Sequence, residues 1–179
     1  KKREDDIDVN AVNSHGKTAL VESSYFGHIG ITTFLLQIKG IDVNKPATEV
    51  GGTALSAASE YGHVEIVTML LGAEGIQVNK SKKDGATPLI IASQNNHIEI
   101  VKLLLGADGI NVNKSIKEGA TPLFMASQNN HIEIVKLLVG AEGIEINHRM
   151  NNGATALGIS RHREHTEIVQ LLTDAGATK

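Results

Sequence analysis

The chain has 179 residues, of which 41% are hydrophobic, and its 17 basic and 20 acidic side chains give a formal net charge of −3. This hydrophobic content supports a buried core and is too high for a disordered chain. The slight acidic excess argues against nucleic-acid binding, which needs a basic surface. Because cysteine is absent, disulfide bonds, thiolate catalysis and sulfur-ligated zinc sites are excluded.

Neither a membrane span nor a signal peptide is visible in the sequence. No segment approaches the roughly 18 consecutive apolar residues that a membrane-spanning helix needs. The basic residues 1–3 are followed by the acidic residues 4–6 and not by an apolar run. Together with the absence of cysteine, this predicts an intracellular protein, cytoplasmic or nuclear, that does not bind a membrane.

Three residue types recur along the chain at one spacing of 34 or 35 residues. The ladders are Thr18, Thr53, Thr87, Thr121 and Thr155; His28, His63, His97, His131 and His165; and Asn10, Asn44, Asn79, Asn113 and Asn147. Residues 80–113 and 114–147 differ at 8 of 34 aligned positions, so 26 are identical. The sequence therefore predicts one domain over 1–179 with five repeats, at about 7–40, 41–75, 76–109, 110–143 and 144–179.

The third repeat shows what the first half of each unit should form. Residues 76–79 alternate between apolar and polar, which favours a short extended segment, and the polar residues 80–85 suit a turn. The hydroxyl of Thr87 can cap a helix, and proline is tolerated at the first helical position. We therefore expect a first helix from Pro88 to about Asn95.

A second helix is predicted to begin near His97. Apolar residues between Ile100 and Leu105 form one face of it, while Glu99 and Lys102 lie outward. Helices of about 8–9 residues are too short to be stable alone. They must pack on each other and on neighbouring repeats, which predicts an elongated stack.

The motif at residues 87–92, Thr-Pro-Leu-Ile-Ile-Ala, and its copy at 121–126 resemble the T-P-L-H-x-A signature of the ankyrin repeat. The downstream segments 97–104 and 131–138 resemble the second helix of that family. The resemblance covers about residues 7–179. It implies an all-α repeat solenoid of five helix-turn-helix repeats with β-hairpin-like loops.

The chain departs from the family at the histidine of the signature. The residues that replace it are Val21, Ser56, Ile90, Phe124 and Gly158. In the family this histidine helps to tie neighbouring turns together, so we expect other contacts to do so here. The polar Glu22 and the long Arg161 stand where inner repeats have other residues, and we interpret them as marking the ends of the array; the alternative is a fragment of a longer array.

The histidine ladder is the strongest candidate for catalysis or metal binding, but stacking argues against both. Stacked helices lie about 8–10 Å apart, whereas Zn–N bonds are about 2 Å long, so two ladder histidines cannot easily share an ion. We expect each histidine to make local hydrogen bonds and each ladder asparagine to bond the turn backbone. Because phosphate-binding loops and nucleophile elbows are also absent, we predict no enzyme, metal or cofactor.

The remaining candidate sites are surface residues. The resemblance implies that a protein partner meets the hairpin tips and the exposed ends of the first helices, on a concave face. Aligned with the family, these positions are Tyr25, Phe26, Glu60, Tyr61, Gln94, Asn95, Gln128, Asn129, His162 and Arg163, with Lys83 and Lys117 at the tips. We hypothesise that Tyr25, Phe26 and Tyr61 form the hot spot. The alternative is that Phe26 packs into the core and the tyrosines cover helix ends.

The lysines of the third and fourth loops suggest a partner with an acidic segment, although such charges can simply keep a turn soluble. The sequence thus predicts a monomeric, non-catalytic protein–protein interaction module. One alternative is a targeting or regulatory segment of a larger enzyme or secreted effector whose catalytic domain lies elsewhere. Another is a small-molecule or nucleotide receptor, which would need a basic and aromatic pocket.

Overall fold

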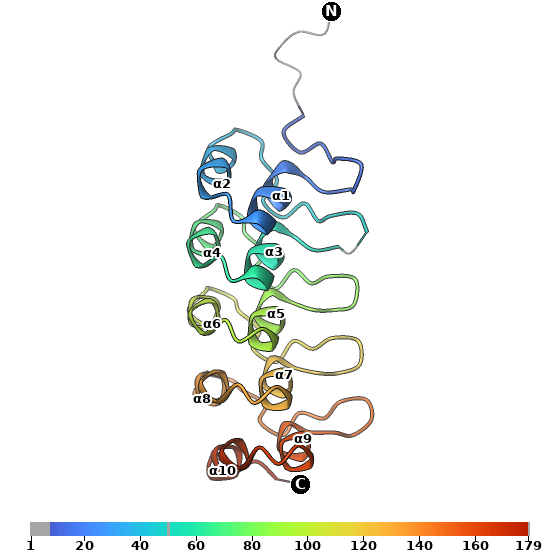
Figure 1. The fold of residues 1–179 in the computed structure, drawn as a ribbon, viewed down its shortest axis with the longest axis vertical. Helices are drawn as coiled ribbons and strands as arrows, with labels where there is room; N and C mark the ends of the chain where they lie inside the picture. Colours follow the sequence, from blue (N-terminus) through green and yellow to red (C-terminus); the bar gives the residue numbers. More distant parts are fainter. Residues whose placement is uncertain (1–7, 50, 179) are drawn as a thin grey trace, which may run out of the picture.

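The computed structural model describes residues 8–49 and 51–178, and these form ten α-helices in five pairs (Figure 1). The start of the first predicted repeat, at residue 7, lies outside the described residues. The helices are α1 (Ala19–Phe26), α2 (Ile29–Leu36), α3 (Ala54–Tyr61), α4 (Val64–Leu71), α5 (Pro88–Gln94), α6 (Ile98–Leu105), α7 (Pro122–Gln128), α8 (Ile132–Val139), α9 (Ala156–His162) and α10 (Thr166–Asp174).

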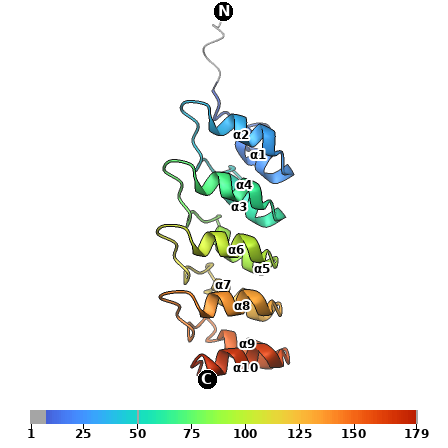
Figure 2. The same cartoon turned by 90° about the vertical axis from the view of Figure 1, so that its left-hand side faces the viewer.

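The five pairs stack along one axis in chain order. Each first helix contacts its own second helix and the first helix of the next repeat, so that α1, for example, contacts α2 and α3. First and second helices form two layers, with the loops projecting beyond the first-helix layer (Figure 1). Figure 2 shows the second helices side by side along the stack. The predicted all-helical solenoid is confirmed.

The ladder threonines begin the first helices, as the sequence predicts. Each threonine hydroxyl accepts a hydrogen bond of 3.0 to 3.3 Å from the N–H group three residues further on. This bond satisfies one of the free N–H groups of the first turn. In the third repeat the helix runs from Pro88 to Gln94 and the next begins at Ile98, within one residue of the predicted bounds.

The loops turn back on themselves without forming strands in the described parts of the chain. In the third loop the Lys82 N–H donates to the Ala86 carbonyl at 2.9 Å, and the Gly85 N–H donates to the Lys82 carbonyl at 3.0 Å. The only β-type pairing among the described residues is an isolated bridge between Val12 and Thr18. The hairpin-like shape is therefore formed by paired turn hydrogen bonds.

The prediction of an extended segment at residues 76–79 is wrong. The Lys80 N–H donates to the Gln77 carbonyl at 3.0 Å, which makes this segment a turn. Alternation of apolar and polar residues persists there because Val78 is buried while Gln77 is exposed. Burial on one side thus produces a strand-like pattern in a segment too short to pair with a strand.

The core is a thin aliphatic layer built from the same positions of each repeat. The leucine that follows the threonine by two residues is almost fully buried in all five copies: Leu20, Leu55, Leu89, Leu123 and Leu157. The second helices contribute Ile66, Ile100, Ile134 and Ile168, which are fully buried. Because these residues lie between repeats, each repeat depends on its neighbours for burial.

The histidine ladder joins each repeat to the one before it. The imidazoles of His97 and His131 lie 3.1 and 3.0 Å from the carbonyl oxygens of Glu60 and Gln94, 37 residues earlier. His63 makes the equivalent contact with the Tyr25 carbonyl, whereas His165 contacts the Ser127 carbonyl through Nδ1. The prediction of local hydrogen bonds was therefore wrong, because the ring points across the repeat boundary.

The asparagine ladder joins each repeat to the one after it. The side chain of Asn113 donates to the Gly143 carbonyl at 2.7 Å and accepts from the Glu145 N–H at 2.9 Å. Asn44 makes the same two bonds with Gly75 and Gln77, each at 2.8 Å. The predicted bond to turn backbone is confirmed, with the turn lying at the boundary with the next repeat.

Neighbouring loops are tied by backbone hydrogen bonds. The Lys117 N–H donates to the Asp84 carbonyl at 3.0 Å, and the Asn151 N–H donates to the Glu118 carbonyl at 3.0 Å. These bonds join neighbouring loops in a chain that lacks the signature histidine. The residue that replaces it in the fourth repeat, Phe124, is buried.

Candidate partner-binding surface

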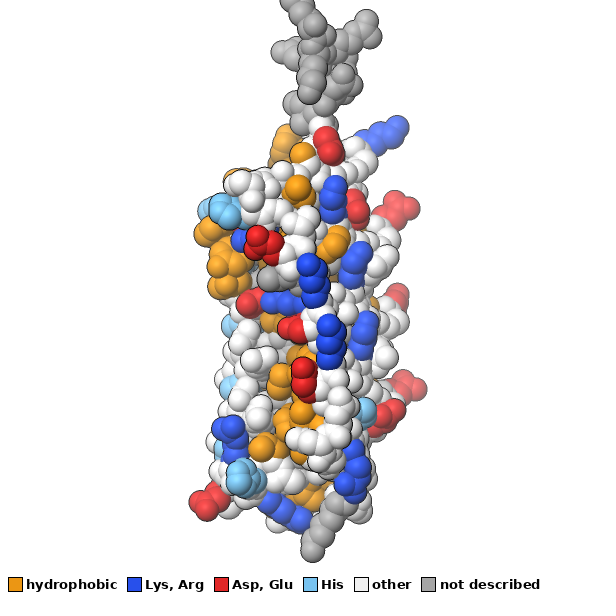
Figure 3. All heavy atoms as spheres, turned by 90° about the vertical axis from the view of Figure 1, so that its right-hand side faces the viewer, with side chains coloured by type: hydrophobic (Ala, Val, Ile, Leu, Met, Phe, Trp, Pro, Cys, Tyr) orange, Lys and Arg blue, Asp and Glu red, His pale blue; other side chains and the backbone are white. Residues whose placement is uncertain are grey.

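The predicted binding residues lie on the side of the stack where the loops project. We define the loop face as the surface formed by the five loops and the first helices beside them. Figure 3 shows this face, with lysines gathered over the upper and middle loops and apolar side chains between the loops and the helices. The opposite, second-helix face carries the outward carboxylates and lysines predicted there, with Glu99 and Lys102 in contact at 2.7 Å.

Three of the predicted residues form an aromatic cluster. The ring centroids of Tyr25 and Tyr61 are 4.3 Å apart, and those of Tyr25 and Phe26 are 4.9 Å apart. Phe26 is 60% exposed and Tyr61 is 45% exposed. Phe26 therefore does not pack into the core, and the structure brings together the residues of the hot-spot hypothesis.

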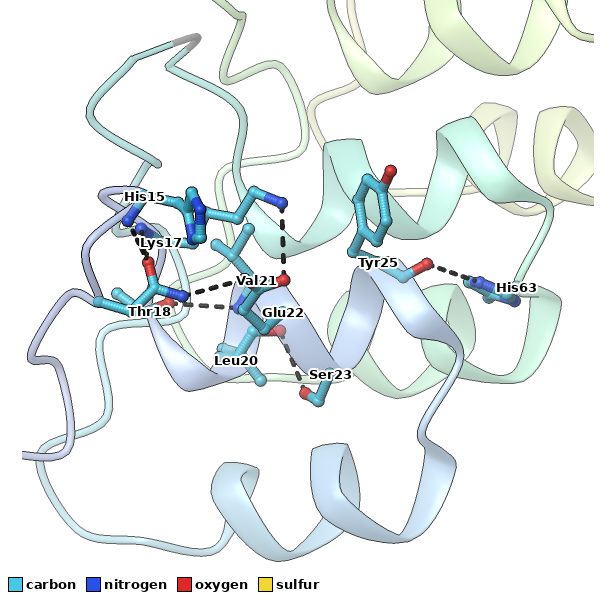
Figure 4. Close-up of polar contacts among 10 residues, drawn as sticks. His15, Lys17, Thr18, Leu20, Val21, Glu22, Ser23, Tyr25 and His63 are labelled. Carbon is cyan, nitrogen blue, oxygen red and sulfur yellow. Dashed lines mark hydrogen bonds and ion pairs between the residues drawn. The ribbon is translucent and has the colours of Figure 1, made fainter.

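The cluster is held in place by polar neighbours. The Lys17 ammonium lies 4.2 Å from the centre of the Tyr25 ring and 3.5 Å from a Glu22 carboxylate oxygen (Figure 4). The Tyr25 carbonyl meets the His63 imidazole at 3.1 Å (Figure 4). A side-chain hydrogen bond with Tyr25 is the main reason that the pKa of Tyr61 is raised to about 12.

A pocket of about 230 Å³ opens beside Tyr25. Its walls come from α1, α3 and the first three loops, and its residues are Lys17, Val21, Tyr25, Ala47, Gly52, Thr53, Ala57, Glu60 and Lys82. Most of this surface is apolar, and the charged residues of its lining are Lys17, Glu60 and Lys82. Among the predicted binding residues, only Tyr25 and Glu60 belong to it.

The pocket exists because the second repeat carries small residues. Ala57 aligns with Ile91 and Met125, which stand four residues after their threonines. Gly52 likewise aligns with alanines of the later repeats. The sequence analysis missed this pocket because it considered only the aromatic, amide and charged side chains at the helix ends and loop tips. The available signal was a deficit of side-chain volume within one repeat, visible once the repeats are aligned.

The other predicted residues are spread along the stack. Asn95 and Asn129 are exposed, yet each side chain donates to a carbonyl of the preceding repeat, Glu60 and Gln94 respectively, at 3.2 Å. Gln128 is half-buried. His162 and Arg163 are exposed in the last repeat, distant along the stack from α1 (Figure 1).

The two lysines predicted at the loop tips are both exposed. The Lys83 ammonium donates to the Thr48 carbonyl of the previous loop at 2.7 Å. Lys117 lies at the aligned position of the next loop, and neither lysine forms an ion pair with a described carboxylate. These two cations thus remain accessible on the loop face.

The part of the chain that the structure describes offers neither a cluster of metal ligands nor a membrane-spanning helix. Residues 8–49 and 51–178 contain no group of three or more potential ligands among His, Cys, Asp and Glu that could hold a metal ion. None of their helices combines the length and the apolar character that crossing a membrane would need.

The sequence matches a model of a known protein family. A model described as ankyrin repeats (3 copies) matches residues 45–116 and 109–179. The two matches together span residues 45–179, or 135 of the 179 residues. A comparison with curated proteins found no match.

Proposed function

Because the chain belongs to the ankyrin repeat family, whose members are generally non-catalytic protein–protein interaction modules, we propose that it binds a protein partner through its loop face. In this proposal the loop tips and the ends of the first helices contact the partner. The chain acts as a monomer and needs no cofactor, metal or catalytic group.

The observation that carries the proposal is the exposed aromatic cluster beside an apolar pocket. Tyrosine and other aromatic side chains are frequent anchors of protein interfaces because they bury much surface at little entropic cost. Phe26 and Tyr61 remain exposed although the chain has only five aromatic residues in total. Contact with a partner would cover these two rings.

The stack supports the proposal because it fixes the surface before binding. The histidine and asparagine bridges connect every repeat to its neighbours through backbone carbonyls and N–H groups. A surface that is already ordered loses less conformational entropy when a partner binds. The positions that differ between repeats can then determine which partner is selected.

The test is site-specific crosslinking followed by affinity measurement. A photoreactive phenylalanine analogue at Tyr61 is expected to crosslink a protein partner in cells that express the full chain. The same analogue at Lys102, on the second-helix face, serves as the matched control and should capture nothing. The captured partner is then identified and purified.

Binding of that partner to variants decides the proposal. We expect Tyr61→Ala and Phe26→Ala each to weaken binding by about tenfold or more, as interface anchors do, while Lys102→Ala leaves it unchanged. Circular dichroism checks that the variants remain folded. Equal crosslinking from both faces, or unchanged affinity in both aromatic variants, would contradict a binding site on the loop face.

A further inference from the structure

Resting on the proposed function, we propose that the pocket beside Tyr25 binds one uncharged apolar side chain of an acidic peptide segment. The carboxylates of that segment lie against the lysines of the second to fourth loops. The partner is therefore a protein that presents a negatively charged segment with an apolar anchor. The size of the pocket, its neutral edge and the charge of the loops each support this assignment.

The size and lining of the pocket suit a single apolar side chain. Its lining includes Val21, Ala47 and Ala57, which are only 4%, 3% and 8% exposed. Because these side chains are packed in the protein interior, they have little room to move and widen the pocket. The volume of about 230 Å³ is below the roughly 300 Å³ at which sites for drug-sized molecules begin. An aromatic or leucine-sized group can enter and lie against Tyr25.

One wall of the pocket is organised in advance. Tyr25 contacts the ring of Tyr61 on one side, with centroids 4.3 Å apart, and lies 4.2 Å from the Lys17 ammonium. A ring held by an aromatic neighbour and a cation loses little freedom when a ligand packs on it. Such a wall favours binding of an apolar group at low entropic cost.

The charged groups at the edge of the pocket are already paired. Lys17 pairs with Glu22, and Lys82 pairs with Glu60. A charged ligand group entering here would have to break one of these pairs or leave its own charge poorly solvated. The pocket itself therefore selects a neutral side chain, and the carboxylates of the ligand must lie outside it.

Unpaired cations lie on the adjacent loops. Residues 45–49 and 51–52, 80–86 and 114–120 contain six lysines and three carboxylates. Five of these lysines form no ion pair with a described residue: Lys45, Lys80, Lys83, Lys114 and Lys117. In Figure 3 the basic side chains lie close together over these loops. The pocket is lined in part by residues of the second and third loops, Ala47, Gly52 and Lys82.

The positive charge of the loops opposes the charge of the chain as a whole. The net charge of the protein is −3, and outward glutamates recur on the second helices at Glu65, Glu99, Glu133 and Glu167. The lysine-rich loops would therefore attract and orient a negatively charged segment. An acidic segment is the complementary ligand for this face.

The test uses defined peptides and fluorescence anisotropy with the full chain. The first probe is a fluorescein-labelled peptide with one phenylalanine followed by glutamates in a glycine–serine background. In the second probe alanine replaces the phenylalanine, and in the third lysines replace the glutamates. A labelled oligo-thymidine is the fourth probe, because stacking and cations could also suit a nucleic acid.

We expect the first probe to bind more tightly than each of the others by about tenfold or more. Ala57→Met should weaken its binding by a similar factor, because methionine, which stands at the aligned position 125, fills the pocket. The double variant Lys83→Glu/Lys117→Glu should also weaken binding, with a reduced salt dependence. Lys102→Glu, on the second-helix face, is the matched control and should have no effect.

Each of the remaining outcomes would overturn the inference. No binding of the first probe, equal binding of the alanine or lysine probe, or tighter binding of oligo-thymidine would exclude the proposed ligand. Unchanged binding in a folded Ala57→Met variant would exclude the pocket. If these results occur while crosslinking at Tyr61 still captures a protein, only the acidic-anchor assignment fails and the loop face remains the binding site.

Discussion

The first two repeats and the middle two repeats are stacked in the same way but present different surfaces. Asn44 and Asn113 make equivalent hydrogen bonds to the next repeat, and His63 and His131 make equivalent contacts to the previous one. On the loop face, however, the first region has an aromatic cluster and a pocket. The middle region has apolar and amide side chains at the aligned positions.

This comparison teaches that stacking and recognition use different positions of the same repeat. Ala57 leaves space where Ile91 and Met125 fill it, and this exchange alters neither the threonine caps nor the ladders. A repeat can therefore change its surface while it keeps its contacts with neighbours. Substitutions at the two classes of position should have separable effects on stability and on binding.

The largest effect is expected from the core of a middle repeat. Leu104 in α6 is fully buried, and α6 contacts both α4 and α8. Leu104→Ala should lower the free energy of unfolding by about 2–5 kcal/mol, because the surrounding helices cannot close the cavity. Urea unfolding followed by circular dichroism measures this change.

The aligned residue of the first repeat provides the comparison. Leu35 in α2 is 7% exposed, and its helix packs on α4 alone among the second helices in the described chain. Leu35→Ala should lower the free energy of unfolding by about 2 kcal/mol or less, at the lower end of the same range. An equal or larger loss for Leu35→Ala would contradict the dependence of burial on neighbours at both sides.

A smaller effect is expected from one asparagine bridge. Asn113→Ala removes two hydrogen bonds across the boundary with the next repeat, one with Gly143 at the end of its own repeat and one with Glu145 in the next. At about 0.5–1.5 kcal/mol per bond, we expect a loss of about 1–3 kcal/mol in urea unfolding. Gln77→Ala is the control, since its side chain makes no hydrogen bond with any described residue, and a comparable loss there would argue against the bridge.

The regular features of the fold were predictable because they are periodic. The threonine, histidine and asparagine ladders identify the repeats and, through Thr87 and Pro88, the start of a helix. The partners of the ladder side chains were not predictable in the same way. Whether His97 reaches its own helix or Glu60 in the previous repeat depends on the distance and rotation between repeats, which no single repeat encodes.

The candidate site was predictable only in part, for a related reason. The aromatic residues could be identified because they are rare in this chain, because Phe26 and Tyr61 occupy aligned positions, and because Tyr25 is adjacent to Phe26. The pocket arises instead from side chains that are missing, at Ala47, Gly52 and Ala57, on a loop and a helix. A cavity depends on how several small residues meet in space, which spacing along the sequence does not reveal.

A stabilising effect of about 1 kcal/mol is expected in the last repeat. The residue before the ladder histidine has a positive φ in every repeat, with Gly27 at 75° and Gly62 at 78° in the first two. In the last repeat this residue is Glu164, with a φ of 59°. A non-glycine residue in this conformation costs about 1–2 kcal/mol. Replacing it with glycine recovers only part of this cost, because glycine also loses more conformational entropy on folding.

Glu164→Gly should therefore raise the free energy of unfolding by about 1 kcal/mol, and Glu164→Ala should raise it less because alanine keeps its Cβ atom. The opposite substitution, Gly62→Ala, should destabilise the second repeat. Its Cβ atom would lie 2.8 Å from the His97 Cε1 atom. Thermal unfolding of the three variants compares these effects, and destabilisation by Glu164→Gly would show that the glutamate serves another purpose.

The smallest effect concerns the ionisation of Tyr61. Because Tyr25 raises the pKa of Tyr61 to about 12, Tyr25→Phe should lower that pKa toward the ordinary value of about 10. The folded protein holds this proton to higher pH than the unfolded chain does. The resulting contribution to stability is complete below about pH 10 and is lost as the pH rises toward 12.

The pKa of Tyr61 can be followed by ¹³C NMR of its Cζ atom, with the signal assigned by its loss in Tyr61→Phe. A downward shift in Tyr25→Phe supports the contact between the two tyrosines. An unchanged value would mean that the Tyr25 hydroxyl does not form the hydrogen bond that raises the pKa of Tyr61. In the middle repeats the positions aligned with Tyr25 are Gln94 and Gln128, and those aligned with Tyr61 are Asn95 and Asn129, so this titration reports on the first region alone.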